Sequence, residues 1–248
     1  MEELDKSQQL QGLTIMKNFV IEFFSELSFD KEKHIYNTGE IQLKSVSNVI
    51  KKYHKNINFK QVAFFVAKSR GITVEEVLTE WEETKNNACK QGTLVHTFSE
   101  LYTSNFDKVI ANNGYEQAVI NFWDLLPTNL VPFLFELQMY SKSLGIGGTA
   151  DIILYNTNTG KFVIADYKTN KDIYKNYNKT KLLTPFNNLL DNPLNKYKIQ
   201  LSLYQILFEQ CGFQVENRFL IWLKEDGSFE QIDLEDLTNE LKTDLKNE

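Results

Sequence analysis

Two acidic residues and a lysine lie in a segment whose pattern predicts a β-hairpin, and together they could hold a divalent cation. Two apolar, β-branched runs flank the polar cluster 156–160, which is rich in turn-forming residues. A turn centred in this cluster sets Asp151 opposite Asp166, with Cβ atoms roughly 4.5–5.5 Å apart. Like charges so close are destabilising unless a cation compensates them. Asp166 and Lys168 are two residues apart in one strand, so both should share a face with Asp151.

An acidic residue two positions before a lysine is not a specific signal in this chain. The sequence holds 33 Asp and Glu residues, and random order would give about three such triplets. Four occur, and those that begin at Glu83, Glu240 and Asp244 lie in helix-like polar surroundings, where residues two apart point to different faces. Only Asp166 is expected in a strand with a second acidic residue across the hairpin.

His96 and Glu136 are further candidate ligands from other segments. His96 lies in the segment 92–102, which reads as a helix, and a neutral imidazole is a good ligand for a divalent metal. A single helical His is more often structural, so both interpretations stay open. Glu136 lies in a predicted strand whose following turn is centred near Ser143, a register that sets it across from Asp151. A shift of one residue would turn it away, and a structural role at a strand edge is the alternative.

Composition indicates one globular domain. The chain has 248 residues, 42% apolar and 24% charged, with no low-complexity tract or internal repeat. The most apolar early run is short and interrupted by Glu22, so neither a signal peptide nor a membrane span is expected, and the expected location is the cytoplasm, the host cytoplasm if the chain is phage-encoded. Cys89 and Cys211 are isolated, which excludes a disulfide framework or a cysteine-rich zinc site.

The distribution of charge matters more than the net charge of −6. The segment 161–198 holds eight Lys against three Asp, with interleaved aromatic residues, a composition that suits phosphate contacts and base stacking. These aromatic residues are Tyr167, Tyr174, Tyr177, Phe186 and Tyr197. A second basic segment contains Lys44, Lys51, Lys52, Lys55 and Lys60. In both segments the alternative is a solvated Lys- and Asn-rich surface, and for the second segment we favour that alternative.

Apolar periodicity and capping residues predict an α/β order of elements. Helices are expected at 1–30, from Ser45 or Ser47 to Tyr53, 59–68 with a stop at Gly71, from Thr73 to a polar joint at 85–91, 92–102, 114–126 and 197–211. A short strand or a hairpin around Asn37-Thr38-Gly39 is expected at 34–43. Strands are expected at 131–140, 149–155, 161–168, 219–223 and 229–232, followed by a charged helix or frayed tail from Leu234. Helical spacing places Gln200 and Tyr204 on one face of their helix.

Four ordered motifs resemble those of RecB-like members of the PD-(D/E)XK nuclease superfamily, above all its compact, stand-alone, phage-type members. The motifs are Gly92-Thr93-x-x-His96, Gly148-x-x-Asp151, Asp166-Tyr167-Lys168-Thr169 and Gln200-x-x-x-Tyr204, and the segment Lys44–Tyr53 resembles the Ser-Val-Thr segment of these proteins. The resemblance implies a restriction-endonuclease-like core, in which a central mixed β-sheet with a catalytic antiparallel hairpin is flanked by α-helices. It implies a single nuclease domain over 1–248, with a mostly helical part at 1–90, a catalytic core at 91–233 and a charged C-terminal helix or tail at 234–248.

The resemblance also implies a role for each matching residue. His96, Asp151, Asp166 and the backbone carbonyl of Tyr167 would bind Mg²⁺ or Mn²⁺, Lys168 would stabilise the attacking hydroxide or the pentavalent phosphate, and Glu136 is a candidate for the acid expected before Asp151. Gln200 and Tyr204 would position the nucleic acid, and Thr169, Lys171 and Lys175 are further candidates for contacting it. An iron-sulfur cluster is excluded, because it needs four cysteine ligands and the chain has two.

The expected function is metal-dependent hydrolysis of DNA phosphodiester bonds, by an exonuclease of DNA recombination or processing acting on single strands or duplex ends. The alternative is a catalytically inactive nuclease scaffold that binds nucleic acid or a protein partner. A third alternative is a structural α/β protein whose hairpin acids merely pair with Lys168. No membrane partner is expected, and assembly as a homo-oligomer or with a recombination partner protein stays open.

Overall fold

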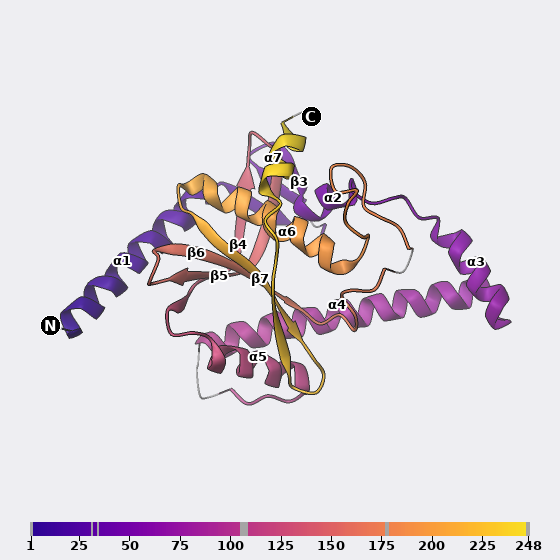
Figure 1. Ribbon diagram of the computed structural model, residues 1–248, viewed down its shortest axis with the longest axis horizontal. Coiled ribbons are helices and arrows are strands. Elements are labelled where there is room, and N and C mark those ends of the chain that lie inside the picture. The colour runs from indigo at the N-terminus through magenta and orange to yellow at the C-terminus, as the bar shows by residue number, and fades with distance from the viewer. Residues whose placement is uncertain (1, 31, 34, 105–108, 177–178, 247–248) are drawn as a thin grey trace.

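The computed structural model describes residues 2–30, 32–33, 35–104, 109–176 and 179–246, arranged as a mixed eight-stranded sheet flanked by helices (Figure 1). The helices are α1 (Glu2–Phe23), α2 (Val46–Lys51), α3 (Phe59–Arg70), α4 (Val74–Ser104), α5 (Gly114–Leu125), α6 (Pro193–Phe208), a 3-10 turn (Glu209–Cys211) and α7 (Thr238–Leu245). The strands are β1 (Leu27–Asp30), β2 (Ile35–Thr38), β3 (Ile41–Ser45), β4 (Leu130–Ser141), β5 (Ile146–Asn156), β6 (Lys161–Lys168), β7 (Val215–Leu223) and β8 (Phe229–Asp233).

The sheet is built around β5, and it forks there. β4 pairs antiparallel with β5 over its whole length. The other edge of β5 has two partners: β3 pairs in parallel at Ile146 and Gly147, and β6 pairs antiparallel at residues 152–156. Among the described residues, Gly148 to Asp151 therefore have no strand partner on this edge. We call this place, where β3 and β6 separate on the edge of β5 at residues 148–151, the fork, and Asp151 lies in it.

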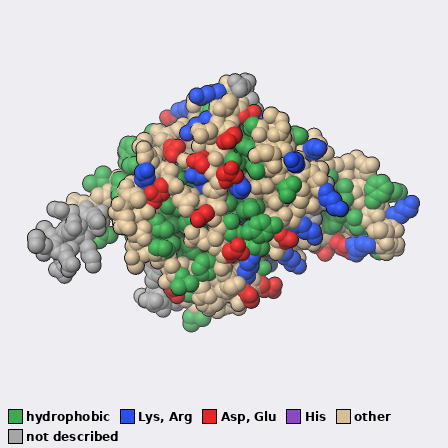
Figure 2. Space-filling model, viewed as in Figure 1, with side chains coloured by type: hydrophobic (Ala, Val, Ile, Leu, Met, Phe, Trp, Pro, Cys, Tyr) green, Lys and Arg blue, Asp and Glu red, His purple; other side chains and the backbone are tan. Residues whose placement is uncertain are grey.

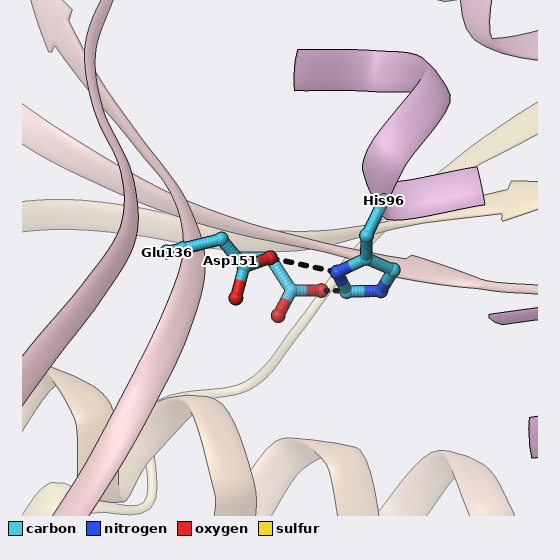
Figure 3. A group of neighbouring side chains, drawn as sticks. All are labelled: His96, Glu136 and Asp151. Atoms are coloured by element: carbon cyan, nitrogen blue, oxygen red, sulfur yellow. Dashed lines mark hydrogen bonds and ion pairs between the residues drawn. The ribbon is translucent and has the colours of Figure 1, made fainter. Parts of the chain in front are cut away.

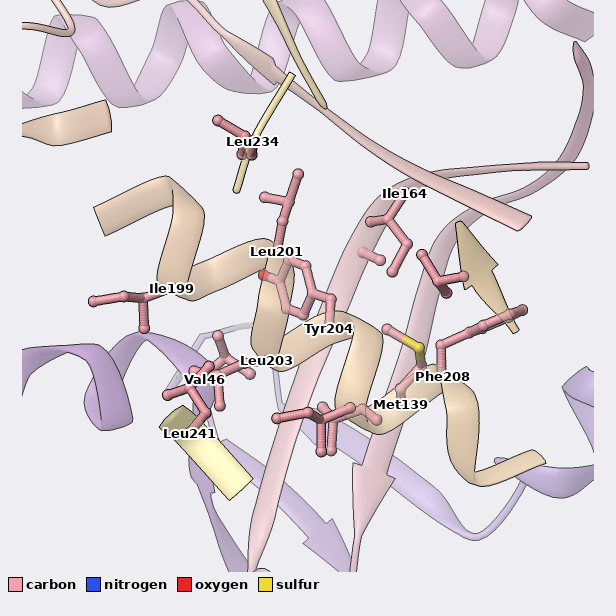
Figure 4. Close-up of a cluster of buried hydrophobic side chains, with 14 of the residues drawn as sticks. Val46, Met139, Ile164, Ile199, Leu201, Leu203, Tyr204, Phe208, Leu234 and Leu241 are labelled. Carbon is pink, nitrogen blue, oxygen red and sulfur yellow. The ribbon is translucent and has the colours of Figure 1, made fainter. Parts of the chain in front are cut away.

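Alternate residues of the central strands bury into two cores, one on each face of the sheet. Ile153 packs into the core that α6 covers, whereas Ile152 and Leu154 pack into the core under α4 and α5. Figure 4 shows the α6 side, where Leu203 and Phe208 lie in the same cluster as Met139 of β4. Full burial of a large apolar side chain contributes about 1.5–3 kcal/mol, so packing on both faces fixes the strands that carry the acidic residues.

α3 and the first half of α4 form an arm that extends from the body, at the right of Figure 1. Its small core joins Ala63 and Ala67 of α3 to Val77 of α4. Between the arm and the body, every residue of α4 from 82 to 90 is exposed. This part of α4 is held by its own helical hydrogen bonds rather than by packing.

Several expected boundaries are corrected by the structure. The first helix ends at Phe23, and Leu27–Asp30 forms β1, because pairing with β2 gives this segment a strand partner that its periodicity did not reveal. The polar joint expected at 85–91 is the middle of a continuous 31-residue helix. No proline interrupts it, and Lys, Ala and Gln are good helix formers, so polarity there marks exposure rather than a break.

In the part of the chain that the structure describes, none of the helices combines the length and apolar character needed to cross a membrane.

Candidate active site

His96, Glu136 and Asp151 converge from three elements into one cluster beside the fork (Figure 3). The Nδ1 atom of His96 on α4 lies 2.8 Å from Oε1 of Glu136 on β4, and its Nε2 atom lies 3.4 Å from Oδ2 of Asp151 on β5. One ligand atom from each residue falls within 4.8 Å of the others. The cluster therefore offers two carboxylate oxygens and one imidazole nitrogen to a single point.

Glu136 reaches the cluster through an unusual backbone conformation. The β4–β5 pairs on either side of it, Phe135 with Ile152 and Leu137 with Ala150, set Glu136 at the level of Asp151, as the turn position near Ser143 predicted. Its φ of 45° is in the left-handed region, where a non-glycine residue costs about 1–3 kcal/mol. Strain of this kind is common at functional sites, and here it accompanies the side chain that completes the cluster.

Asp166 lies beside the cluster but is not its third member. The hairpin register sets Asp151 across from Asp166, one step beyond the pair formed by Ile152 and Ala165. The Asp166 carboxylate, however, forms an ion pair with the Nζ atom of Lys168 in a buried position. The group of ligand atoms that lie within 4.8 Å of one another thus comprises His96, Glu136 and Asp151, while the Asp166 carboxylate pairs with the half-buried Lys168.

Five charged groups lie close enough to influence one another, namely His96, Glu136, Asp151, Asp166 and Lys168. Burial disfavours the imidazolium, but the hydrogen bond to Glu136 and the charges of Asp151, Glu136 and Asp166 outweigh it and raise the pKa of His96 to about 9. Burial, and then the charge of Asp166, raise the pKa of Asp151 well above its usual value. The pKa of Lys168 is raised by the charges of Asp166 and Asp151 despite its burial, so Lys168 stays protonated. The site thus holds three carboxyl groups, those of Glu136, Asp151 and Asp166, beside two cationic groups, those of His96 and Lys168.

A buried support under the site was not recognised in the sequence. The Tyr167 hydroxyl hydrogen-bonds with Ser99 Oγ at 2.7 Å and accepts from the Trp123 indole at 2.9 Å. The backbone N–H of Tyr167 donates to Asp151 Oδ2 at 3.3 Å. Tyr167 therefore connects β6 and β5 to α4, the helix that carries His96. Helical spacing could have indicated Ser99, which lies three residues after His96.

Gln200 and Tyr204 meet as their spacing predicted, and they lie near the site. The Gln200 amide donates to the Tyr204 hydroxyl at 3.0 Å. Burial, and then the charges of Asp166 and Asp151, raise the pKa of Tyr204 well above its usual value. A cavity of about 530 Å³ adjoins this pair, and Tyr204 and Gly148 are among the residues that line it.

The basic segment after β6 supplies fewer stacking groups than its composition predicted. Phe186 is buried against Tyr53 and belongs to the core. Tyr197 is half-buried and carries the Lys168 ammonium over its ring, 4.7 Å from the centroid. Tyr174 is exposed, whereas Tyr177 lies outside the described residues. Of the other candidates for contacting nucleic acid, Thr169 is half-buried, and Lys171 and Lys175 are exposed in the segment that leads to α6.

The donor set fits a hard divalent cation. Mg²⁺ and Mn²⁺ prefer oxygen ligands and tolerate an imidazole, and the cluster offers that combination at one point. Burial and the charge of Asp166 raise the pKa of Asp151 although His96 and Lys168 oppose them, and a bound divalent cation would relieve that repulsion.

Comparisons with known proteins do not identify a family. No family model matches the chain, and no curated protein matches it. Among solved structures, the crystal structure of SSO0001 is similar over 82% of this chain and 81% of its own chain, with 13% sequence identity and a TM-score of 0.33. A similarity at that level carries no argument about function.

Proposed function

We propose that the protein is a metal-dependent nuclease that hydrolyses DNA phosphodiester bonds, an exonuclease of DNA recombination or processing. The observation that carries the proposal is the convergence of His96, Glu136 and Asp151 beside the buried pair of Asp166 and Lys168. The four ordered sequence motifs support it, since each contributes a residue at or near the fork.

The residues divide the chemistry between them. His96, Glu136 and Asp151 would hold Mg²⁺ or Mn²⁺, which when bound makes a water molecule more acidic and offsets the charge of the phosphate. Asp166 fixes the Lys168 ammonium at the fork, and its own charge adds to the field that attracts a cation. Lys168 then presents a permanent positive charge to the phosphate as negative charge develops on its oxygens.

The protein also positions the substrate around this centre. Gln200 and Tyr204, joined by their hydrogen bond, line the side of the fork made by α6 and would orient the strand. The carbonyl of Tyr167 is the remaining candidate ligand, held in place by the hydrogen bonds of Tyr167 to Ser99 and Trp123.

The decisive assay incubates the purified protein with linear duplex and single-stranded DNA, with Mg²⁺ or Mn²⁺ and then with EDTA. Cleavage should require the metal and should fall at least about 100-fold in Glu136→Gln and Asp166→Ala. Glu136 is 41% exposed in its side chain, so Glu136→Gln should remain folded. The double variant Glu83→Ala/Lys85→Ala, which removes the same acid-x-Lys spacing far from the site, is the matched control and should cut normally.

Three results would contradict the proposal. Failure of every metal preparation to cut DNA or RNA would favour a catalytically inactive scaffold, as would a melting temperature that no divalent cation changes. Normal cleavage by folded Asp166→Ala would remove Asp166 from the mechanism and with it the role assigned to Lys168.

A further inference from the structure

Residues 41–74 form a basic stretch outside the candidate site. They contain seven Lys or Arg residues and no Asp or Glu, in a chain whose net charge is −6. The stretch includes α2, the link that follows it and all of α3. Figure 2 shows Lys and Arg side chains mixed with hydrophobic ones over the right of the molecule, where Figure 1 places α3. Such a local excess of positive charge attracts a polyanion.

The outer face of α3 combines cations with exposed rings. Ala63 and Ala67 are buried against α4, so the opposite side of α3 faces outward. Lys60, Phe64 and Lys68 are four residues apart and form one row, roughly 12 Å long at 1.5 Å per residue.

The two rings of this face are unusually accessible. Phe64 and Phe65 are 53% and 60% exposed, and their centroids lie 5.7 Å apart. Phenylalanine side chains are normally buried, because each loses about 1.5–3 kcal/mol of stabilisation when left in water. Two adjacent exposed rings therefore suggest a ligand with flat apolar faces.

The cations of this row are free for a ligand. Within the described residues, Lys60 and Lys68 form no ion pair, whereas Arg70 is engaged by Glu80 at 2.6 and 2.9 Å. Glu76 is also engaged, since it accepts hydrogen bonds from the backbone and hydroxyl of Thr73 at the start of α4. Glu76 and Glu80 thus find their partners within the arm itself.

We propose that the α3 face, defined as Lys60, Phe64, Phe65 and Lys68, binds single-stranded nucleic acid. The lysines contact phosphates, and the rings stack on bases, which a duplex would keep paired and unavailable. A second copy of this chain is the competing occupant, and the oligomeric state measured below distinguishes it. The inference rests on the proposed function for its biological meaning, but its test is independent of cleavage.

The test measures binding of a labelled mixed-sequence oligonucleotide, about 20 nucleotides long to exceed one binding site, to the full chain in EDTA. Phe64→Leu/Phe65→Leu keeps the apolar character of the α3 face but removes the rings. Loss of one stacked base should weaken binding roughly 5- to 150-fold. Lys60→Gln/Lys68→Gln should reduce the slope of log affinity against log salt by about 1.4, at about 0.7 per phosphate contact. Lys142→Gln/Lys246→Gln, which changes two exposed lysines outside the α3 face and outside the basic segment 161–198, is the charge-matched control.

The outcomes separate this proposal from the nuclease assignment. Weaker binding in both α3 variants, with the control unchanged, supports the α3 face even if no DNA is cut. Unchanged binding in both α3 variants overturns it, even if cleavage is normal. If Phe64→Leu/Phe65→Leu binds normally, or if all three double variants lose affinity equally, base stacking at this face is refuted. Concentration-dependent dimers that Phe64→Ser abolishes would assign the face to a second copy instead.

Discussion

Replacement of Asp151 by asparagine should stabilise the metal-free protein while it abolishes cleavage. Burial and the charge of Asp166 raise the pKa of Asp151, so folding is opposed when its carboxylate is ionised. Relief of such a site typically contributes about 0.5–2 kcal/mol. For a chain of this size, about 1 kcal/mol corresponds to about 2–4 °C, so Asp151→Asn should melt about 1–8 °C above wild type in EDTA.

The sign of this effect depends on pH in a defined way. Because the folded pKa of Asp151 lies above the unfolded value of about 3.9, the folded state binds more protons between the two values. Stability therefore falls as pH rises through this window, and the full cost remains at higher pH. Below about pH 3.9 the carboxyl is protonated in both states, so the difference between Asp151→Asn and wild type should disappear there.

Metal should reverse the order of stabilities. At a concentration one hundred times the dissociation constant, a ligand stabilises the folded state by about 2.7 kcal/mol. At about 2–4 °C per kcal/mol, this raises the melting temperature by about 5–11 °C. Wild type should gain this amount, and Asp151→Asn, which lacks a charged ligand, should gain little. Differential scanning calorimetry in EDTA and in Mg²⁺ or Mn²⁺ measures both effects. If Asp151→Asn is less stable than wild type in EDTA, Asp151 is a structural partner of His96 and the reasoning is refuted.

Three further expectations follow from buried contacts. Lys168→Met should destabilise the protein by about 3–5 kcal/mol, since it leaves the Asp166 charge buried and unpaired. Denaturant unfolding should show a smaller loss of stability in the double variant Asp166→Asn/Lys168→Met. Losses that add in the double variant would contradict the pairing of Asp166 with Lys168. Burial lowers the pKa of His54, so wild type should lose stability relative to His54→Gln as pH falls below about 6.5, which melting curves of both proteins at pH 8 and 5.5 measure. Gly148→Ala would place a Cβ atom 2.7 Å from Val46 Cγ2 and 2.9 Å from the Tyr204 ring, which should cost about 1–3 kcal/mol and impair cleavage. An unchanged melting temperature would show that both side chains can move aside.

The hairpin was predictable because its signals are local. Turn-forming residues between two β-branched runs place the turn within the cluster 156–160, and the observed pairing of Ile152 with Ala165 centres it between Asn158 and Thr159. The end of α3 at Gly71 was predictable for the same reason, since a residue with a φ of 70° favours glycine.

The composition of the cluster was less predictable because it depends on contacts distant in sequence. The turn near Ser143 gave the right register for Glu136, but its left-handed φ has no local signal in the sequence. The direction of the Asp166 carboxylate depends on where Lys168 is buried. A pattern can place residues on a face, but it does not determine which side chains pair there.

The exposed span of α4 should set the shortest oligonucleotide that can contact the α3 face and the candidate site at once. From Val77, where the arm packs, to His96 at the site is nineteen residues, roughly 28 Å of helix at 1.5 Å per residue. At 3.4 Å per stacked nucleotide, a strand of about eight nucleotides covers that length. Shorter oligonucleotides could not reach both places at once, so changes on α3 should raise KM only above this threshold. Seven residues could be inserted in α4 between 85 and 90, with a matching extension of the link before α3. The insertion would lengthen the exposed span of α4 by about 10 Å and rotate the arm about the helix axis by only about 20°. The threshold should then move by about three nucleotides.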